Sequence, residues 1–111
     1  MEIAHTIVAA LEEKKGEDIL LLDLKGIVPY TDYFVLCSGT SDRMLKALME
    51  AARDKVQQDN AMKTRVEGQA LDGWMLADFG DVVLHLFSAE QRNYYSLEEL
   101  WTQAKVVLHM Q

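Results

Sequence analysis

The sequence predicts an α/β fold: one layered domain of residues 1–111, with a mixed sheet of about five strands flanked by helices. Half of the 111 residues are hydrophobic, which is enough to form one core. Segments in which apolar residues recur at helical spacing alternate with short apolar runs of strand length. Helices between some strands permit parallel pairs and a tight hairpin requires an antiparallel pair, so we expect a mixed sheet.

The chain opens with a predicted amphipathic helix. Its apolar residues recur at helical spacing: Ile3, Ile7, Val8 and Leu11. Lys14 and Lys15 place cations in the last turn, and Gly16 is a stop signal. We therefore expect the helix to end just before Gly16.

Two strands follow this helix. Residues 18–24 contain an unbroken apolar run, which is typical of a central strand covered on both faces. Gly26 and Pro29 mark a turn, and residues 33–37 are predicted to form the second strand.

The longest helix is predicted after residues 38–41, with Ser41 as its cap. Its apolar stripe consists of Met44, Leu45, Leu48, Met49, Ala52 and Val56. Residues 62–66 can form a short edge strand, because Lys63 and Arg65 discourage further pairing. Residues 68–73 are expected to be a loop.

A hairpin is predicted from two apolar runs, residues 76–79 and 82–87, with Gly80 between them. A two-residue loop at either 79–80 or 80–81 puts a mixed set of side chains on one face. This mixed face consists of Trp74, Leu76, Asp78, Val83, His85 and Phe87. The opposite face is wholly apolar and should be core: Met75, Ala77, Phe79, Val82, Leu84 and Leu86.

A final helix is predicted from Leu97. Ser96 can cap it, Glu99 completes a capping box, and Tyr95 can pack on Leu100. Its inner stripe would be Leu97, Leu100, Trp101, Ala104 and Leu108.

Composition limits the function. The formal charge of −7 argues against binding by broad neutralisation of nucleic-acid phosphates and favours a basic protein partner. Cys37 is the single cysteine, so no internal disulfide can form and a reducing compartment is expected. The sequence has no apolar stretch long enough to span a membrane and no secretory signal pattern, which leaves the cytosol as the expected location.

Two groups of residues suggest a ligand-binding or catalytic site. Asp78, Asp81 and His85 could converge on a metal ion, as in a metal-dependent nucleotidyltransferase or hydrolase. The alternative is a pair of turn carboxylates with a hydrogen-bonded histidine. Residues 38–41 precede a helix and could hold an anion, although capping alone explains their serines and threonine.

Arg92, Tyr94 and Tyr95 follow the hairpin directly. Tyrosine and arginine often anchor protein interfaces. The alternative is that Arg92 forms a solvated ion pair with Glu90 or Glu98 while both tyrosines pack on Trp101.

Blocks along nearly the whole chain resemble the ribosomal silencing factor family, also called Iojap-like. They are EDILLLDL at 17–24, DYFV at 32–35, SG at 38–39, SDR at 41–43, EG at 67–68, GW at 73–74, DFGDVVLH at 78–85, RNYY at 92–95, LE at 97–98 and LW at 100–101. Thr31 and Tyr94 are small departures, since alanine and phenylalanine are common at these positions, and residues 75–77 are a looser apolar run than is usual in the family. No charged motif residue is missing.

The resemblance implies a nucleotidyltransferase-like topology without catalytic acids, and no cofactor. It implies a translational repressor that binds the large ribosomal subunit through ribosomal protein number fourteen and sterically blocks joining of the small subunit when nutrients are short. The resemblance also implies a homodimer in the free state, as is common in the family, and little direct RNA binding is expected. We expect the partner-binding residues to be Trp74, Asp78, His85, Arg92 and Tyr94. The alternatives are the metal-dependent enzyme above or an interaction module in ribosome assembly.

Overall fold

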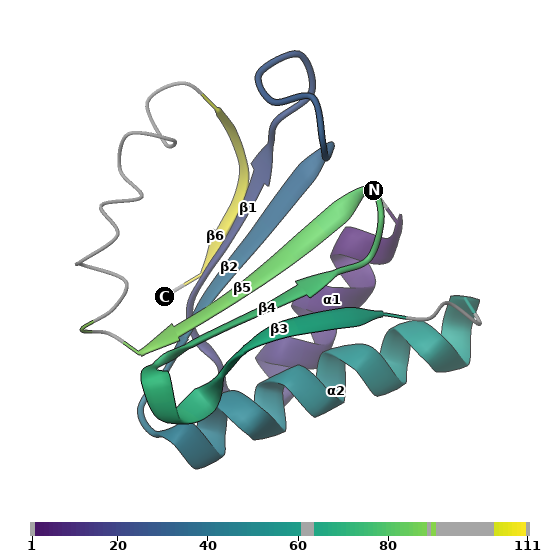
Figure 1. Cartoon of the computed structure of the whole chain (residues 1–111). Coiled ribbons are helices and arrows are strands. Elements are labelled where there is room, and N and C mark those ends of the chain that lie inside the picture. The colour runs from purple at the N-terminus through teal and green to yellow at the C-terminus, as the bar shows by residue number, and fades with distance from the viewer. Residues whose placement is uncertain (1, 61–63, 89, 91–103, 111) are drawn as a thin grey trace.

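The computed structural model describes residues 2–60, 64–88, 90 and 104–110 (Figure 1). This part of the chain contains two α-helices, a short 3-10 turn (Ala70–Asp72) and six strands. The elements are α1 (Glu2–Glu13), β1 (Glu17–Asp23), β2 (Tyr33–Gly39), α2 (Asp42–Asn60), β3 (Arg65–Gln69), β4 (Trp74–Asp78), β5 (Val82–Ser88) and β6 (Lys105–Met110). Neither helix is long and apolar enough to cross a membrane.

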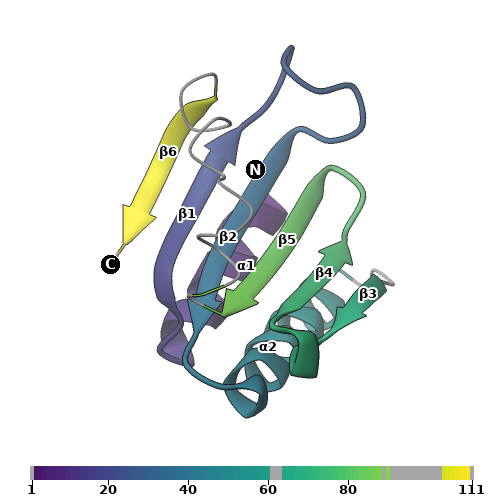
Figure 2. The same cartoon turned by 60° about the vertical axis from the view of Figure 1, so that its left-hand side comes forward.

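The strands form one mixed sheet in the order β3-β4-β5-β2-β1-β6. β2 and β5 are parallel, and every other neighbouring pair is antiparallel. Both α1 and α2 lie against the same face of the sheet (Figures 1 and 2). The predicted mixed sheet with flanking helices is therefore confirmed, with six strands rather than about five.

Two apolar clusters lie on the two faces of the sheet. The larger one joins α1 and α2 to inward residues of the strands, among them Ile19, Val35 and Leu84. The second cluster lies on the other face and consists of Leu20, Leu22, Leu24, Phe34, Leu36, Val83 and Phe87, all buried. Because β1, β2 and β5 contribute to both clusters, their side chains are buried on both faces, as the unbroken apolar run of β1 predicts.

The hairpin of β4 and β5 has the predicted geometry. The amide of Phe79 donates to the carbonyl oxygen of Val82 at 2.8 Å, which leaves Gly80 and Asp81 as a two-residue loop. Gly80 has φ 90°, a backbone conformation that favours glycine. Leu76 pairs with His85, so the two faces carry the predicted sets of side chains.

The prediction of a helix through Ala104 and Leu108 was wrong, because residues 105–110 form strand β6. Leu108 and Met110 pack against the larger cluster, and Leu108 pairs with Leu21 of β1. The spacing of Ala104 and Leu108 fits a helix, but the backbone edge of β1 needs a hydrogen-bonding partner and β6 supplies it. The predicted helix start at Ser96 and Leu97 lies outside the described residues.

Two boundaries also differ from the predictions. α1 ends at Glu13, so Lys14 and Lys15 follow the helix instead of occupying its last turn, and Lys15 adopts φ 62°. β3 begins at Arg65 and includes residues 68–69, which were expected to be loop. The expected edge position of this strand is confirmed.

Gly16 is required for space rather than for its backbone angles. A Cβ at this position would lie 2.5 Å from Sγ of Cys37 and 3.1 Å from a methyl carbon of Leu48. The chain between α1 and β1 therefore passes directly over the buried core, where only glycine fits.

Candidate docking surface

The mixed face is continuous across β4 and β5. Trp74 pairs with Phe87, Leu76 with His85, and Asp78 with Val83. Trp74 and Leu76 are partly buried and pack against the second cluster, whereas Asp78 is exposed. The face thus offers an indole, an aliphatic side chain and a carboxylate side by side, which suits recognition of another protein.

His85 lies among aromatic side chains in the middle of this face. Its ring is 4.6 Å from that of Phe34, edge-on, and 5.9 Å from that of Phe87, parallel. Both ring nitrogens are out of contact with solvent and have no hydrogen-bond partner within the described part of the chain. Burial lowers the pKa of His85 from 6.5 to about 4, so the imidazole is neutral at pH 7. The alternative of a hydrogen-bonded histidine therefore does not hold among these residues.

The two aspartates of the hairpin turn have structural partners. Oδ1 of Asp78 accepts a hydrogen bond from the amide of Gly80 at 2.8 Å, which stabilises the turn. The carbonyl oxygen of Asp81 accepts from the hydroxyl of Thr31 at 2.8 Å and from the amides of Asp32 and Tyr33, both at 3.0 Å. These bonds fasten the hairpin turn to the start of β2.

A metal site at the hairpin has no support in this region. Over residues 2–60, 64–88, 90 and 104–110, no group of three or more His, Cys, Asp or Glu side chains could hold a metal ion. The ring nitrogens of His85 are buried among apolar side chains, away from the turn that carries Asp81. The turn-carboxylate interpretation fits the geometry better.

Residues 38–41 act as a helix start. Oγ of Ser41 accepts from the amide of Met44 at 3.1 Å, and the carbonyl oxygen of Ser41 accepts from the amide of Leu45 at 3.0 Å. A Cβ at Gly39 would lie 2.9 Å from a methyl carbon of Leu45, so this glycine allows close packing. The prediction that Ser41 caps α2 is confirmed.

Gly68 lies against Trp74, a contact that sequence reasoning missed. A Cβ at Gly68 would lie 2.6 Å from Cε3 and 2.8 Å from Cζ3 of the Trp74 indole. Gly68 also has φ 82°, although it belongs to strand β3. A glycine within a strand often marks such a close approach, and this was the available signal.

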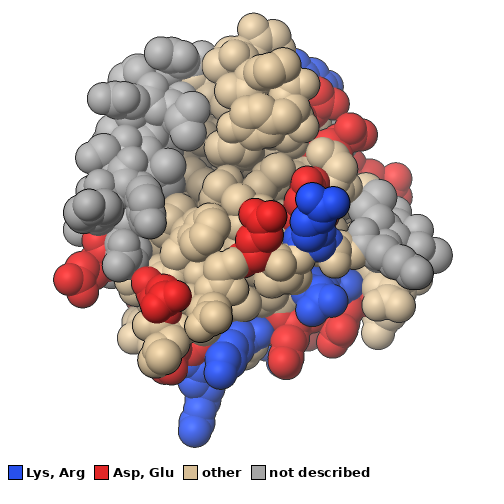
Figure 3. All heavy atoms as spheres, viewed as in Figure 1, with Lys and Arg blue, Asp and Glu red and all other residues tan. Residues whose placement is uncertain are grey.

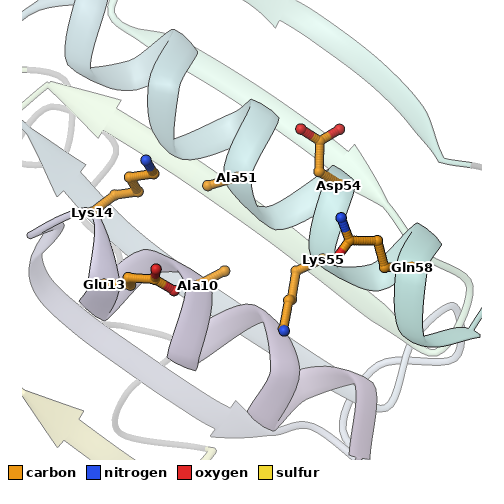
Figure 4. Close-up of a pocket in the computed structure, with 7 residues that line it drawn as sticks. All are labelled: Ala10, Glu13, Lys14, Ala51, Asp54, Lys55 and Gln58. Carbon is orange, nitrogen blue, oxygen red and sulfur yellow. The ribbon is translucent and has the colours of Figure 1, made fainter.

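The groove between α1 and α2 shows no arrangement typical of an active site (Figure 4). It encloses about 260 Å³, and Ala10 and Ala51 line it where the helices face each other. Lys14 and Lys55 extend toward the opposite helix, while Asp54 points away. The described lining of this groove includes no serine, threonine, cysteine or histidine.

Charged side chains are unevenly distributed over the surface. In Figure 3 they gather over α2 and near β3 and β4, whereas the loop between β1 and β2, at the top, presents a largely uncharged surface. A hollow of about 380 Å³ lies between the first turn of α2, residues 70–73 and the end of β5. Leu71 on its rim is 80% exposed, and its described lining includes Asp42, Asp72 and Glu90 but no lysine or arginine.

The other two predicted docking residues, Arg92 and Tyr94, lie outside the described residues, so the structure does not relate them to the mixed face. The structure brings Trp74, Asp78 and His85 onto one face, as predicted.

Comparison with known proteins decides the family. The family model described as "Ribosomal silencing factor during starvation" matches residues 1–111. This chain belongs to the ribosomal silencing factor family. It is 41% identical over 96 residues to the ribosomal silencing factor RsfS of Bacillus subtilis (strain 168), covering 86% of this chain and 81% of the relative.

Two further matches extend the comparison. A crystal structure of a Chromobacterium violaceum protein superposes with a TM-score of 0.85 at 33% identity, covering 91% of this chain and 84% of that one. A Mus musculus protein named "Mitochondrial assembly of ribosomal large subunit protein 1" is 38% identical over 101 residues, covering 86% of this chain and 43% of that protein. The resemblance stated from the sequence is confirmed, while the relation to nucleotidyltransferases stays a prediction.

Proposed function

We propose that this silencing factor is a translational repressor that binds the large ribosomal subunit through ribosomal protein number fourteen. The bound factor then sterically blocks joining of the small subunit and lowers translation when nutrients are limited. The match of the whole chain to the silencing factor family carries this proposal. The mixed face supports it, because it presents recognition groups, and no group of side chains among the described residues could hold a metal ion.

Charge supports a basic protein as the partner. The chain has a formal charge of −7, and Asp78 is exposed at one end of the mixed face. Close to its other end, the hollow beside residues 70–73 has three carboxylates in its lining. A partner with lysine or arginine side chains gains favourable interactions at both places, whereas RNA phosphates are repelled.

The experiment separates binding from its consequence. Purified protein is sedimented with isolated large subunits, and formation of complete ribosomes is then measured after adding small subunits. We expect the protein to sediment with large subunits and to reduce joining. Large subunits that neither bind the protein nor lose their ability to join would contradict the proposal.

Two variants locate the docking surface. Asp78→Asn keeps an oxygen that can accept from the amide of Gly80 but removes the charge, and we expect it to weaken binding about fivefold, typical of one exposed ion pair. Trp74→Ala removes an interface aromatic, for which about 30-fold weaker binding is typical. Asp54→Asn is the matched control, because it removes a carboxylate of α2, which covers the opposite face of the sheet. Equal affinities of wild type, Asp78→Asn and Trp74→Ala would move the docking surface elsewhere.

A role in assembly of the large subunit is the second candidate, favoured by the name of the mouse relative. It predicts binding to assembly precursors without inhibition of joining, so the same joining measurement distinguishes the two. A homodimer in the free state and a cytosolic location remain predictions.

A further inference from the structure

Gly68 of β3 lies directly against Trp74 of the mixed face. Gly68 pairs with Met75, and the next residue of β3, Gln69, pairs with Trp74. The six-membered ring of the indole lies over the Cα of Gly68, where a Cβ would be 2.6 Å from Cε3 and 2.8 Å from Cζ3. Cβ atoms do not approach other atoms so closely, so any side chain at position 68 must displace the indole.

Two independent features require glycine here. The backbone of Gly68 has φ 82°, which side chains other than glycine rarely adopt. The Cβ position is also within 2.7 Å of the carbonyl oxygen of Trp74, so the space is closed by backbone as well as by the ring. The backbone of β3 at Gly68 thus lies in direct contact with the indole.

We infer that Gly68 is a positioning residue for docking: it provides the flat backbone surface on which the Trp74 indole is held in place for the partner. This inference rests on the proposed function. An interface aromatic binds best when its rotamer is fixed before association, because no side-chain entropy is then lost on binding. Trp74 contacts Gly68 on β3 and packs against the second cluster, whose member Phe87 on β5 is its cross-strand partner, and these contacts hold its ring.

The chain offers a control for the backbone angle. Gly26 has φ 78°, close to that of Gly68, but a Cβ at Gly26 would have no atom within 4 Å. Gly26→Ala therefore introduces similar backbone strain without touching Trp74. Any difference between Gly68→Ala and Gly26→Ala reports the contact and not the conformational preference of glycine.

The first measurement follows the indole itself. The chain has two tryptophans, so Trp101→Phe leaves Trp74 as the only one. In this background we expect Gly68→Ala to change the fluorescence emission and the indole N–H resonance of Trp74, and Gly26→Ala to leave both unchanged. Unchanged Trp74 signals in Gly68→Ala would overturn the inference.

The second measurement is a double-mutant cycle on binding to large subunits. We expect Gly68→Ala to weaken binding about tenfold, equivalent to about 1.4 kcal/mol, and Gly26→Ala to have little effect. In a Trp74→Ala background, Gly68→Ala should cause no further loss, because the group it positions is absent. A further tenfold loss in that background would show that Gly68 acts through the fold rather than through Trp74.

The outcomes separate this inference from the function on which it rests. Wild-type protein that fails to bind large subunits would refute the proposed function and the docking role of Gly68 together. Wild-type binding, with an affinity of Gly68→Ala equal to that of Gly26→Ala, would refute the positioning role alone.

Discussion

Replacement of His85 by leucine should flatten the dependence of stability on pH. In the native state the imidazole is buried among Phe34 and Phe87, and its pKa falls from 6.5 to about 4. In the unfolded chain it regains its ordinary pKa. At pH 7 both states hold a neutral imidazole, so proton binding makes no difference to stability there.

The sign and size follow from proton linkage. As pH falls below 6.5 the unfolded chain binds a proton at His85, while the native state does not until about pH 4. Stability therefore decreases as pH falls through this interval, because the unfolded state binds more protons. A difference of about 2.5 between the two pKa values corresponds to about 3 kcal/mol. Between pH 6.5 and about 4 the wild type loses this amount from its free energy of unfolding, whereas His85→Leu does not.

Urea denaturation followed by circular dichroism, repeated at several pH values between about 7 and about 4, measures this difference. Acidic residues titrate in both proteins, so only the gap between the two free energies of unfolding is informative. His85→Gln should behave like His85→Leu, because glutamine does not titrate. His5→Gln removes an exposed imidazole of α1 and serves as the control. Parallel pH profiles for wild type and His85→Leu would refute the argument that burial keeps His85 neutral.

Two other substitutions test how the fold is held together. Thr31→Val removes the hydroxyl that donates to the carbonyl oxygen of Asp81 at 2.8 Å. Because Thr31 is only 6% exposed, we expect the free energy of unfolding, measured by urea denaturation, to fall by about 1 kcal/mol. Equal stability of the two proteins would mean that water replaces the bond. Gly16→Ala should destabilise by about 1–3 kcal/mol, because its Cβ would lie 2.5 Å from Sγ of Cys37. Adding Cys37→Ala should recover part of that loss, and simple additivity of the two substitutions would contradict the contact.

The sheet was largely predictable because its signals are local. The apolar run of β1, the break after β2 and the glycine between β4 and β5 each depend on neighbouring residues. The capping serine of α2 is likewise local, and its bond to Met44 is present. The side-chain alternation of the hairpin then placed Trp74 and His85 on one face.

The missed features depend on contacts that are distant in sequence. β6 is a strand because it pairs with β1, more than 80 residues earlier in the chain, and the spacing of Ala104 and Leu108 carries no trace of that partner. The environment of His85 depends in the same way on Phe34, which the parallel pairing of β2 and β5 brings beside it. The contact of Gly68 with Trp74 follows from the register of β3 and β4, which local patterns do not fix.

The hairpin turn gives a structural role to the two aspartates that suggest metal chemistry. Asp78 closes the turn through its bond to Gly80, and the carbonyl oxygen of Asp81 holds the loop that leads into β2. Asp78 therefore stabilises the turn between β4 and β5, and Asp81 fixes this turn relative to β2; these three strands carry the side chains around His85. A side chain held in place by fixed strands loses little entropy on binding, so under the proposed function the turn would contribute to docking by keeping the mixed face rigid. Asp78→Asn, which preserves the turn bond, should for this reason weaken binding much less than Trp74→Ala, which removes a contact group from that face.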